Sequence, residues 1–291
     1  MTEPTLVTRT GVSALLRAAL PSVPVVGALP GIRKDRDATD GFAVTRPSAT
    51  VEREQVERYA VLCGFPVKDT VPVTYPHMLA APLHLAVLSD PRFPSAAMGM
   101  VHVENSISQH RPIAIGETLE VTTAVGAPLP HPVGTAWALT TTVSAAGETV
   151  WESVSTYLRR GRRNPDATWP DELVDVPPSG PVFALRSDLG RRYAAVSGDY
   201  NPIHLTTLSA KALGFPRHIA HGMWTKARCL AALENRLSDA VRIDVAFKKP
   251  VFLPSSVAFG SRPAQDGNGY DFSLHRRGSD TLHLLGRTRA L

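Results

Sequence analysis

RYAVLCG at residues 58–64 and RYAAVSG at residues 192–198 are two versions of one short pattern. Each closes a run of helical spacing with a glycine, the residue type that commonly follows the end of an α-helix. Two longer segments come next, MLAAPLHLAVL at 78–88 and MWTKARCLAAL at 223–233, and both place apolar residues at helical spacing. The chain therefore contains two similar halves, each with two helices in the same order.

Strand patterns follow the second helix of each half. Residues 100–108 lead into RPIAIG in the first half, and residues 243–247 lead into KPVFLP in the second. Alternating segments come next, and AGET at 146–149 and RGSD at 277–280 have the composition of hairpin turns. The shared order of helix, helix, strand, proline-containing corner and hairpin supports the repeat more strongly than any single match does.

One apolar helix and several antiparallel strands in each half predict an α+β fold. An antiparallel sheet must bury one face, and the helix is the only large apolar partner available. We expect two curved antiparallel sheets, each wrapped around a central helix and placed side by side, so that they cover each other's exposed edges or faces. The predicted domains are 1–160 and 181–291, joined by a linker at 161–180 that is rich in Pro, Asp and Gly.

The composition is typical of a globular protein, and 291 residues are enough for two domains. No run of about 18 apolar residues is present, so we expect no membrane span. The apolar stretch 14–20 is interrupted by Arg17, unlike a secretory signal. Cys63 and Cys229 each lie in an apolar stretch, which predicts buried, reduced thiols and a cytoplasmic protein.

The formal net charge is +5, without a long Lys/Arg run and with few aromatic residues. This pattern does not favour nucleic-acid binding. A basic surface suits an anionic small molecule or an acidic carrier protein equally well. A role in solubility alone is an open alternative.

The two halves differ in the segment that follows the repeated glycine. The second half reads DYNPIH at 199–204, then LGFPR at 213–217 and AHGM at 220–223. The first half has Phe65 where Asp199 stands, and it reaches its second helix by a shorter route without an Asn-Pro-x-His segment. One half has a polar loop that the other lacks.

This loop has the residues for acid–base chemistry. Pro202 disfavours the helical region for Asn201, so the loop can fold back and bring Asp199 to His204. A carboxylate and an imidazole together can hold a water molecule and move protons in both directions. The helix that begins at Gly222 offers free backbone N–H groups for a developing enolate oxygen, and glycine permits the close approach of a carbonyl.

An ordinary turn is the competing interpretation of the same residues. In Asp-x-Asn-Pro, the Asp and Asn side chains can simply bond their own backbone. For this fragment alone, both interpretations stay open. His204, the His-Gly-Met helix start and the missing counterpart in the first half favour a functional loop.

Together these segments resemble the MaoC-like, R-specific enoyl-CoA hydratase family, also called hydratase 2. The resemblance rests on Gly198-Asp199-x-Asn201-Pro202-x-His204, on Gly-Phe-Pro at 214–216 and on His-Gly-Met at 221–223. It covers about residues 181–291, and the first half resembles the family only through the repeat. This implies a double hot-dog fold in which one domain has lost its catalytic loop.

The resemblance also implies a mechanism and a set of site residues. Asp199 and His204 would activate the water or accept and return protons, Asn201 would hold the loop, and the Gly222 amide would join the oxyanion hole. The reaction would be the reversible conversion of a (3R)-hydroxyacyl thioester into a trans-2-enoyl thioester and water, in fatty-acid metabolism. It needs no cofactor apart from the CoA or phosphopantetheine of the substrate. Some relatives carry a small polar residue about two turns after this glycine, where the present chain has Cys229, so that contact is in doubt.

Substrate contacts are predicted around the same helix start. His221 and Met223 would contact the substrate. Some of the basic residues nearby in sequence would meet the phosphates of CoA or of a carrier-protein arm: Arg217, Lys226, Arg228, Lys248 and Lys249, with Lys248 and Lys249 as the first pair to test. A solvated surface charge is the alternative for each basic residue. The helix at 78–88, apolar except for His84, would supply an acyl pocket that accepts long or bulky chains.

Other site classes are disfavoured. No Cys-x-x-Cys or His-Glu-x-x-His segment predicts a metal site, and no Gly-x-Ser-x-Gly segment predicts a serine hydrolase. An acyl-CoA thioesterase stays open because a fold does not fix a function. A non-catalytic subunit that binds acyl thioesters is the third hypothesis. The expected assembly is a monomeric double hot-dog or a homodimer.

Overall fold

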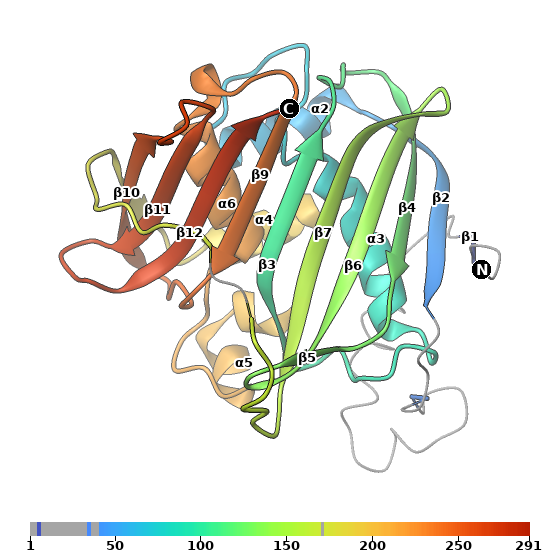
Figure 1. Cartoon of the computed structure of the whole chain (residues 1–291), viewed down its shortest axis with the longest axis vertical. Coiled ribbons are helices and arrows are strands. Elements are labelled where there is room, and N and C mark those ends of the chain that lie inside the picture. Colours follow the sequence, from blue (N-terminus) through green and yellow to red (C-terminus); the bar gives the residue numbers. More distant parts are fainter. Residues whose placement is uncertain (1–4, 7–33, 36–40, 170–171) are drawn as a thin grey trace.

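The computed structural model of the chain describes residues 5–6, 34–35, 41–169 and 172–291 (Figure 1). Within these ranges, twelve strands form one sheet in the order β1-β2-β4-β6-β7-β3-β9-β12-β11-β10-β8, with β5 paired to β6. The strands are β1 (Thr5–Leu6), β2 (Phe42–Thr50), β3 (Met100–Gln109), β4 (Thr118–Val125), β5 (Leu129–His131), β6 (Gly134–Ala145), β7 (Glu148–Arg160), β8 (Val182–Leu185), β9 (Val241–Phe247), β10 (Ser255–Pro263), β11 (Tyr270–Arg276) and β12 (Leu282–Ala290).

All the labelled helices lie on one side of this sheet (Figure 1). They are α2 (Arg53–Cys63), α3 (Pro76–Ser89), α4 (Leu189–Ser197), α5 (Thr207–Ala212) and α6 (Gly222–Ala231), with short 3-10 helices η3 (Pro202–His204) and η4 (Glu234–Arg236). The central helix α3 packs on β2, β4 and β6, and α6 packs on β11. The predicted α+β class, with a curved antiparallel sheet around a central helix in each half, is confirmed.

The two halves join edge to edge along β3 and β9. These strands pair antiparallel, with Glu104 opposite Ala246 and Gln109 opposite Val241. The sequence left open whether edges or faces would be covered. The backbone groups at the edge of each half-sheet bond to the other half, so neither strand is left unpaired there.

The repeated glycines end their helices as predicted. Gly64 and Gly198 have φ angles of +83° and +75°, and their N–H groups donate to Ala60 and Ala194 respectively. A residue with a side chain is strained in this left-handed conformation, so glycine suits both positions. The helices that they end, α2 and α4, contact each other across the boundary between the halves.

Three strands were not predicted, and one of them, β1, has only two residues. In β2, Pro47 and a register shift between Arg46 and Ala49 interrupt the alternation that marks a strand. The third strand, β8, has only four residues, 182–185, and forms one edge of the sheet by pairing with β10.

The segment predicted as a linker packs against both halves. Trp169 Nε1 donates to Glu104 on β3, and the Val176 N–H donates to Ser273 Oγ on β11. The domain boundaries at 160 and 181 remain predictions. The N-terminal stretch 14–20 lies outside the described residues, and among those described no helix is long and apolar enough to cross a membrane.

Candidate active site

The loop after α4 is folded by its own side chains. Asp199 Oδ1 accepts the Asn201 N–H at 3.1 Å, and Asn201 Oδ1 accepts the Ile203 N–H at 3.4 Å. Pro202 then starts the 3-10 helix η3, which ends at His204. These short-range bonds turn the chain back, so that His204 returns toward Asp199. Asn201 holds the loop from inside.

Three polar side chains meet at this turn. One side-chain ligand atom from each of Asp199, His204 and His221 lies within 4.8 Å of the others. The imidazoles of His204 and His221 stack with 3.7 Å between ring centroids. His221 Nε2 lies 3.0 Å from the Asp199 carbonyl oxygen and 3.8 Å from its Oδ2. The Asp199 side chain is 47 % exposed, whereas both histidines are buried, so solvent reaches the group through its carboxylate.

The protonation of His204 follows from its surroundings. Its Nδ1 lies 2.9 Å from the Ile219 carbonyl oxygen, and a carbonyl only accepts, so Nδ1 carries the hydrogen. The lone pair is therefore on Nε2. Burial and the neighbouring His221 lower the pKa of His204 to about 3, against the opposing effect of Asp199. At neutral pH this imidazole is an uncharged proton acceptor.

Asp199 is an anion at the same pH. Burial raises the pKa of its carboxyl, but His221, His204 and the Asn201 N–H together outweigh that effect and hold the pKa below its ordinary value. The site thus combines a carboxylate with a neutral imidazole whose tautomer is fixed. Such a pair can take a proton from one water molecule and return it to a carbon.

Helix α6 begins beside this pair. His221 is the N-cap residue, and no side chain in the described part of the chain caps the helix. Its first backbone N–H groups are free to meet an oxygen anion. Gly222 has a further role that the sequence did not predict. A Cβ there would lie 3.2 Å from the Phe247 ring, so glycine makes room for that ring.

Comparisons with known proteins show the family of the chain. Residues 171–262 match the family described as MaoC like domain. The chain is 36% identical over its whole length to the whole of 3-hydroxyacyl-thioester dehydratase X from Mycobacterium tuberculosis. The chain belongs to the MaoC-like dehydratase family.

Solved structures agree with this assignment of fold. HtdX from Mycobacterium tuberculosis superimposes with a TM-score of 0.76, covering 86% of this chain and 100% of that chain at 36% identity. A MaoC-like dehydratase from Phytophthora capsici gives a TM-score of 0.74 at 20% identity, covering 87% and 96%. An acyl-ACP thioesterase from Bacteroides thetaiotaomicron, at 11% identity and a TM-score of 0.55, covers 85% and 97% and shares the fold alone. The predicted hot-dog architecture is thereby confirmed.

The residues predicted to contact the substrate of this MaoC-like chain differ in burial. Met223 is buried in the hydrophobic core. Arg217 is exposed, with its guanidinium 5.8 Å from the centre of the Phe252 ring. Lys248 and Lys249 are also exposed. The lysines precede a segment, 251–253, that bonds to residues 218–220. This places them close in the fold to the residues that lead into His221.

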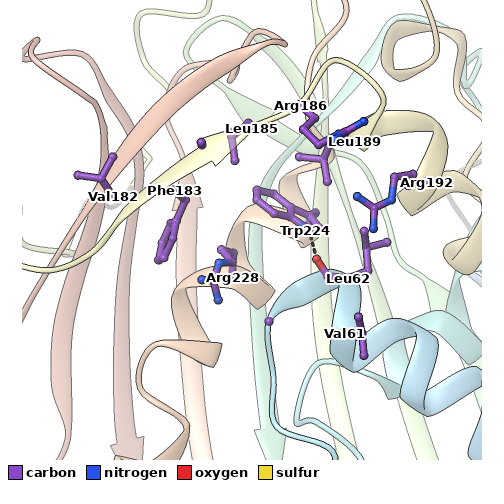
Figure 2. Close-up of a pocket in the computed structure, with 12 residues that line it drawn as sticks. Val61, Leu62, Val182, Phe183, Leu185, Arg186, Leu189, Arg192, Trp224 and Arg228 are labelled. Atoms are coloured by element: carbon purple, nitrogen blue, oxygen red, sulfur yellow. Dashed lines mark hydrogen bonds between the residues drawn. The ribbon is translucent and has the colours of Figure 1, made fainter.

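A separate cavity of about 360 Å³ lies between α2, β8, α4 and α6 (Figure 2). Its charged lining residues are all arginines: Arg186, Arg192 and Arg228. Arg228 lies 4.0 Å from the centre of the Phe183 ring and donates to the Cys63 carbonyl at the end of α2. The lining does not include Asp199, His204 or His221, so this cavity is distinct from the site around the Asp199 loop.

The two stacked histidines argue against a metal ion shared with Asp199. A metal binds in the plane of an imidazole ring, but these rings face each other at an interplanar angle of 26°. In addition, Nδ1 of His204 and Nε2 of His221 are already paired with carbonyl oxygens. At the position two turns along α6, Cys229 is buried and supplies no hydroxyl group.

Proposed function

We propose that this MaoC-like chain is a hydro-lyase that reversibly dehydrates (3R)-hydroxyacyl thioesters to trans-2-enoyl thioesters in fatty-acid metabolism. The observation that carries the proposal is the convergence of the Asp199 carboxylate and the His204 imidazole beside the free N-terminus of α6. The full-length similarity to a 3-hydroxyacyl-thioester dehydratase supports the same reaction class.

In the hydration direction, a water molecule sits between the Asp199 carboxylate and His204 Nε2. As one of these bases takes a proton, the water oxygen bonds to C3 of the enoyl chain, and the electron pair of the C2–C3 double bond moves toward the thioester carbonyl. The Gly222 N–H and its neighbours in the first turn of α6 stabilise the enolate oxygen. The proton then passes to C2, so one water molecule is added and both bases regain their starting state.

No redox or metal cofactor is required by this chemistry, because the thioester acidifies C2 and the side chains move the proton. The substrate carries its own CoA or phosphopantetheine group. We place the protein in the cytoplasm, where the two buried thiols, Cys63 and Cys229, would stay reduced.

The direct test is hydration of trans-2-enoyl-CoA substrates from crotonyl-CoA to long chains, followed by loss of the enoyl absorbance. We expect turnover to a (3R)-hydroxyacyl product, identified by chiral analysis. Release of free CoA thiol without a hydroxyacyl product would instead identify a thioesterase. Thioester binding without turnover, unchanged in Asp199→Asn, would identify a non-catalytic binding subunit.

A second prediction concerns the anionic end of the substrate. We expect Lys248→Glu combined with Lys249→Glu to raise KM for enoyl-CoA about tenfold with little change in kcat, because both side chains are exposed and a lost phosphate contact weakens binding alone. Steady-state kinetics measure both constants.

Arg192→Glu provides the comparison, since Arg192 is exposed and lines the separate arginine cavity. The KM of this variant for enoyl-CoA should stay near that of the unmodified protein. A rise in KM for Arg192→Glu, with none for the double lysine variant, would contradict the prediction and place the phosphates in that cavity.

A further inference from the structure

Four ring side chains gather on the inner side of the first half. His77 and His84 come from α3, His102 from β3 and Tyr157 from β7. Ring centroids are 5.1 Å apart for His77 and His84, and 4.7 Å apart for His102 and Tyr157. His84 links the group, because its Nδ1 lies 3.2 Å from the Tyr157 hydroxyl. We call these four residues the histidine–tyrosine cluster.

The cluster adjoins the catalytic loop of the other half. The His102 ring lies 5.1 Å from the Phe247 ring, and Phe247 packs against Gly222 at the start of α6. Gly222 follows His221, which contacts Asp199. The Asp199 carboxylate also acts to raise the pKa values of His84 and His102, although burial has the larger effect and keeps both below the ordinary value.

Several nitrogens here have no partner within the described chain. They are Nδ1 of His77, Nε2 of His102 and Nδ1 of His221. Buried polar atoms in folded proteins nearly always have a hydrogen-bond partner, and leaving one without a partner is costly. A hydrocarbon chain supplies no such partner, whereas an oxygen atom of a ligand does. Two of these atoms, on His77 and His102, belong to the cluster, where the two ring centroids lie 6.3 Å apart, and they therefore indicate a ligand with a polar atom beyond those that react.

The cluster makes part of the predicted acyl pocket polar, whereas the sequence predicted an apolar one. The helix at 78–88 was predicted to offer an apolar wall interrupted only by His84. In the structure, His77 at the start of α3 and two strand residues join His84 in a polar group. Burial lowers the pKa of His84 to about 4 and that of His102 to about 3, so these imidazoles are neutral. Neutral imidazoles suit hydroxyl or carbonyl groups better than a carboxylate.

We propose that the histidine–tyrosine cluster binds a hydroxyl or carbonyl oxygen on the acyl chain beyond C3, so that oxygenated acyl thioesters are preferred over hydrocarbon ones. The proposal rests on the proposed function, in which the C3 oxygen is held by Asp199 and His204 and the thioester oxygen by α6. The oxygen atoms of the reacting groups therefore already have partners, so the oxygen that the cluster binds must be another oxygen of the acyl chain.

The test compares trans-2-octenoyl-CoA with oxo-octenoyl-CoA substrates that carry a carbonyl at carbon 5, 6 or 7. We expect kcat/KM to be about tenfold higher for at least one oxygenated chain, the effect of one well-placed hydrogen bond to a buried polar group. In His77→Leu combined with His102→Leu, that preference should disappear while hydration of octenoyl-CoA is retained. His110→Leu, an exposed position just after β3, is the control and should keep the preference.

Binding of the saturated thioesters separates this proposal from the proposed function. Dissociation constants of octanoyl-CoA and its oxo analogues, measured by calorimetry, should show the same preference without any reaction. Equal constants, or a preference that survives in the double leucine variant, would overturn the role of the cluster even if hydration is observed. A binding preference without hydration would leave the cluster in place and overturn the hydro-lyase.

Discussion

Asp199→Asn is expected to lower kcat for enoyl-thioester hydration by about a hundredfold or more, the usual contribution of a general acid–base group. The amide keeps the size of the side chain and can still accept the Asn201 N–H that shapes the turn. It is no longer a base at any accessible pH. The loss should therefore appear in kcat while the fold, followed by circular dichroism, is retained.

His204→Gln should cause a loss of similar size. The glutamine can still donate to the Ile219 carbonyl, but it lacks the Nε2 lone pair that accepts the proton. Asp188→Asn is the matched control, because Asp188 pairs with Arg186 at the surface before α4. Rates like those of the unmodified protein in both the Asp199 and the His204 variants would refute the mechanism.

The pH dependence gives a second check on the same two residues. Both bases work in their unprotonated forms, and the pKa values of both lie below the ordinary ones, with that of His204 at about 3. Activity should therefore stay constant as pH falls through 6.5, the ordinary pKa of histidine, and decline only in more acidic solution. A loss of half the activity near pH 6.5 would show that His204 titrates like an exposed imidazole.

Local sequence signals explain why the convergence of Asp199 and His204 was predictable. Asp199, Asn201, Pro202 and His204 lie within six consecutive residues, and their turn is made by bonds between neighbours. The ends of α2 and α4 were equally predictable, because the left-handed backbone at these positions favours glycine, which stands at Gly64 and Gly198. Such features depend on the nearest few residues, which a sequence displays directly.

Features made by distant segments were not predictable. The stacking of His221 on His204 depends on how the start of α6 meets η3 after folding, and the packing of Phe247 against Gly222 depends on how α6 meets β9. The histidine–tyrosine cluster draws on one helix and two strands. In the sequence, His77 and His102 are isolated histidines without any pattern, and only the sheet register and the helix position bring them together.

Lys226 also depends on packing between distant segments, and its replacement is expected to have a large effect on stability. This fully buried side chain on α6 donates from Nζ to Asn105 Oδ1 at 2.6 Å, to the Asn105 carbonyl at 3.1 Å and to the Ile243 carbonyl at 3.2 Å. Asn105 lies on β3 and Ile243 on β9, the two strands that join the halves. Burial lowers the pKa of Lys226, yet three acceptors around one nitrogen match the three donors of an ammonium group.

Lys226→Met should lower the free energy of unfolding by about 2–4 kcal/mol, because it leaves buried acceptors without a donor while filling nearly the same space. Removing the cost of burying the amine offsets part of this loss. Urea denaturation measures the change through the midpoint. Lys68→Met is the control: Lys68 also links the halves, through Glu234 at 2.8 Å, but it is 43 % exposed and should contribute less than about 1 kcal/mol.

Adding Asn105→Leu to Lys226→Met decides why stability is lost. If unsatisfied acceptors are the cause, removing the amide oxygen together with the amine should restore part of the stability, since replacing both partners with apolar groups is often nearly neutral. If the double variant is less stable than the single one, the loss comes from packing or from the bonds that the Asn105 amide donates to Val154 and Ser155 on β7. Unchanged stability in Lys226→Met itself would show that the other contacts between the halves are sufficient, and that α6 reaches its position beside Asp199 and His204 without this lysine.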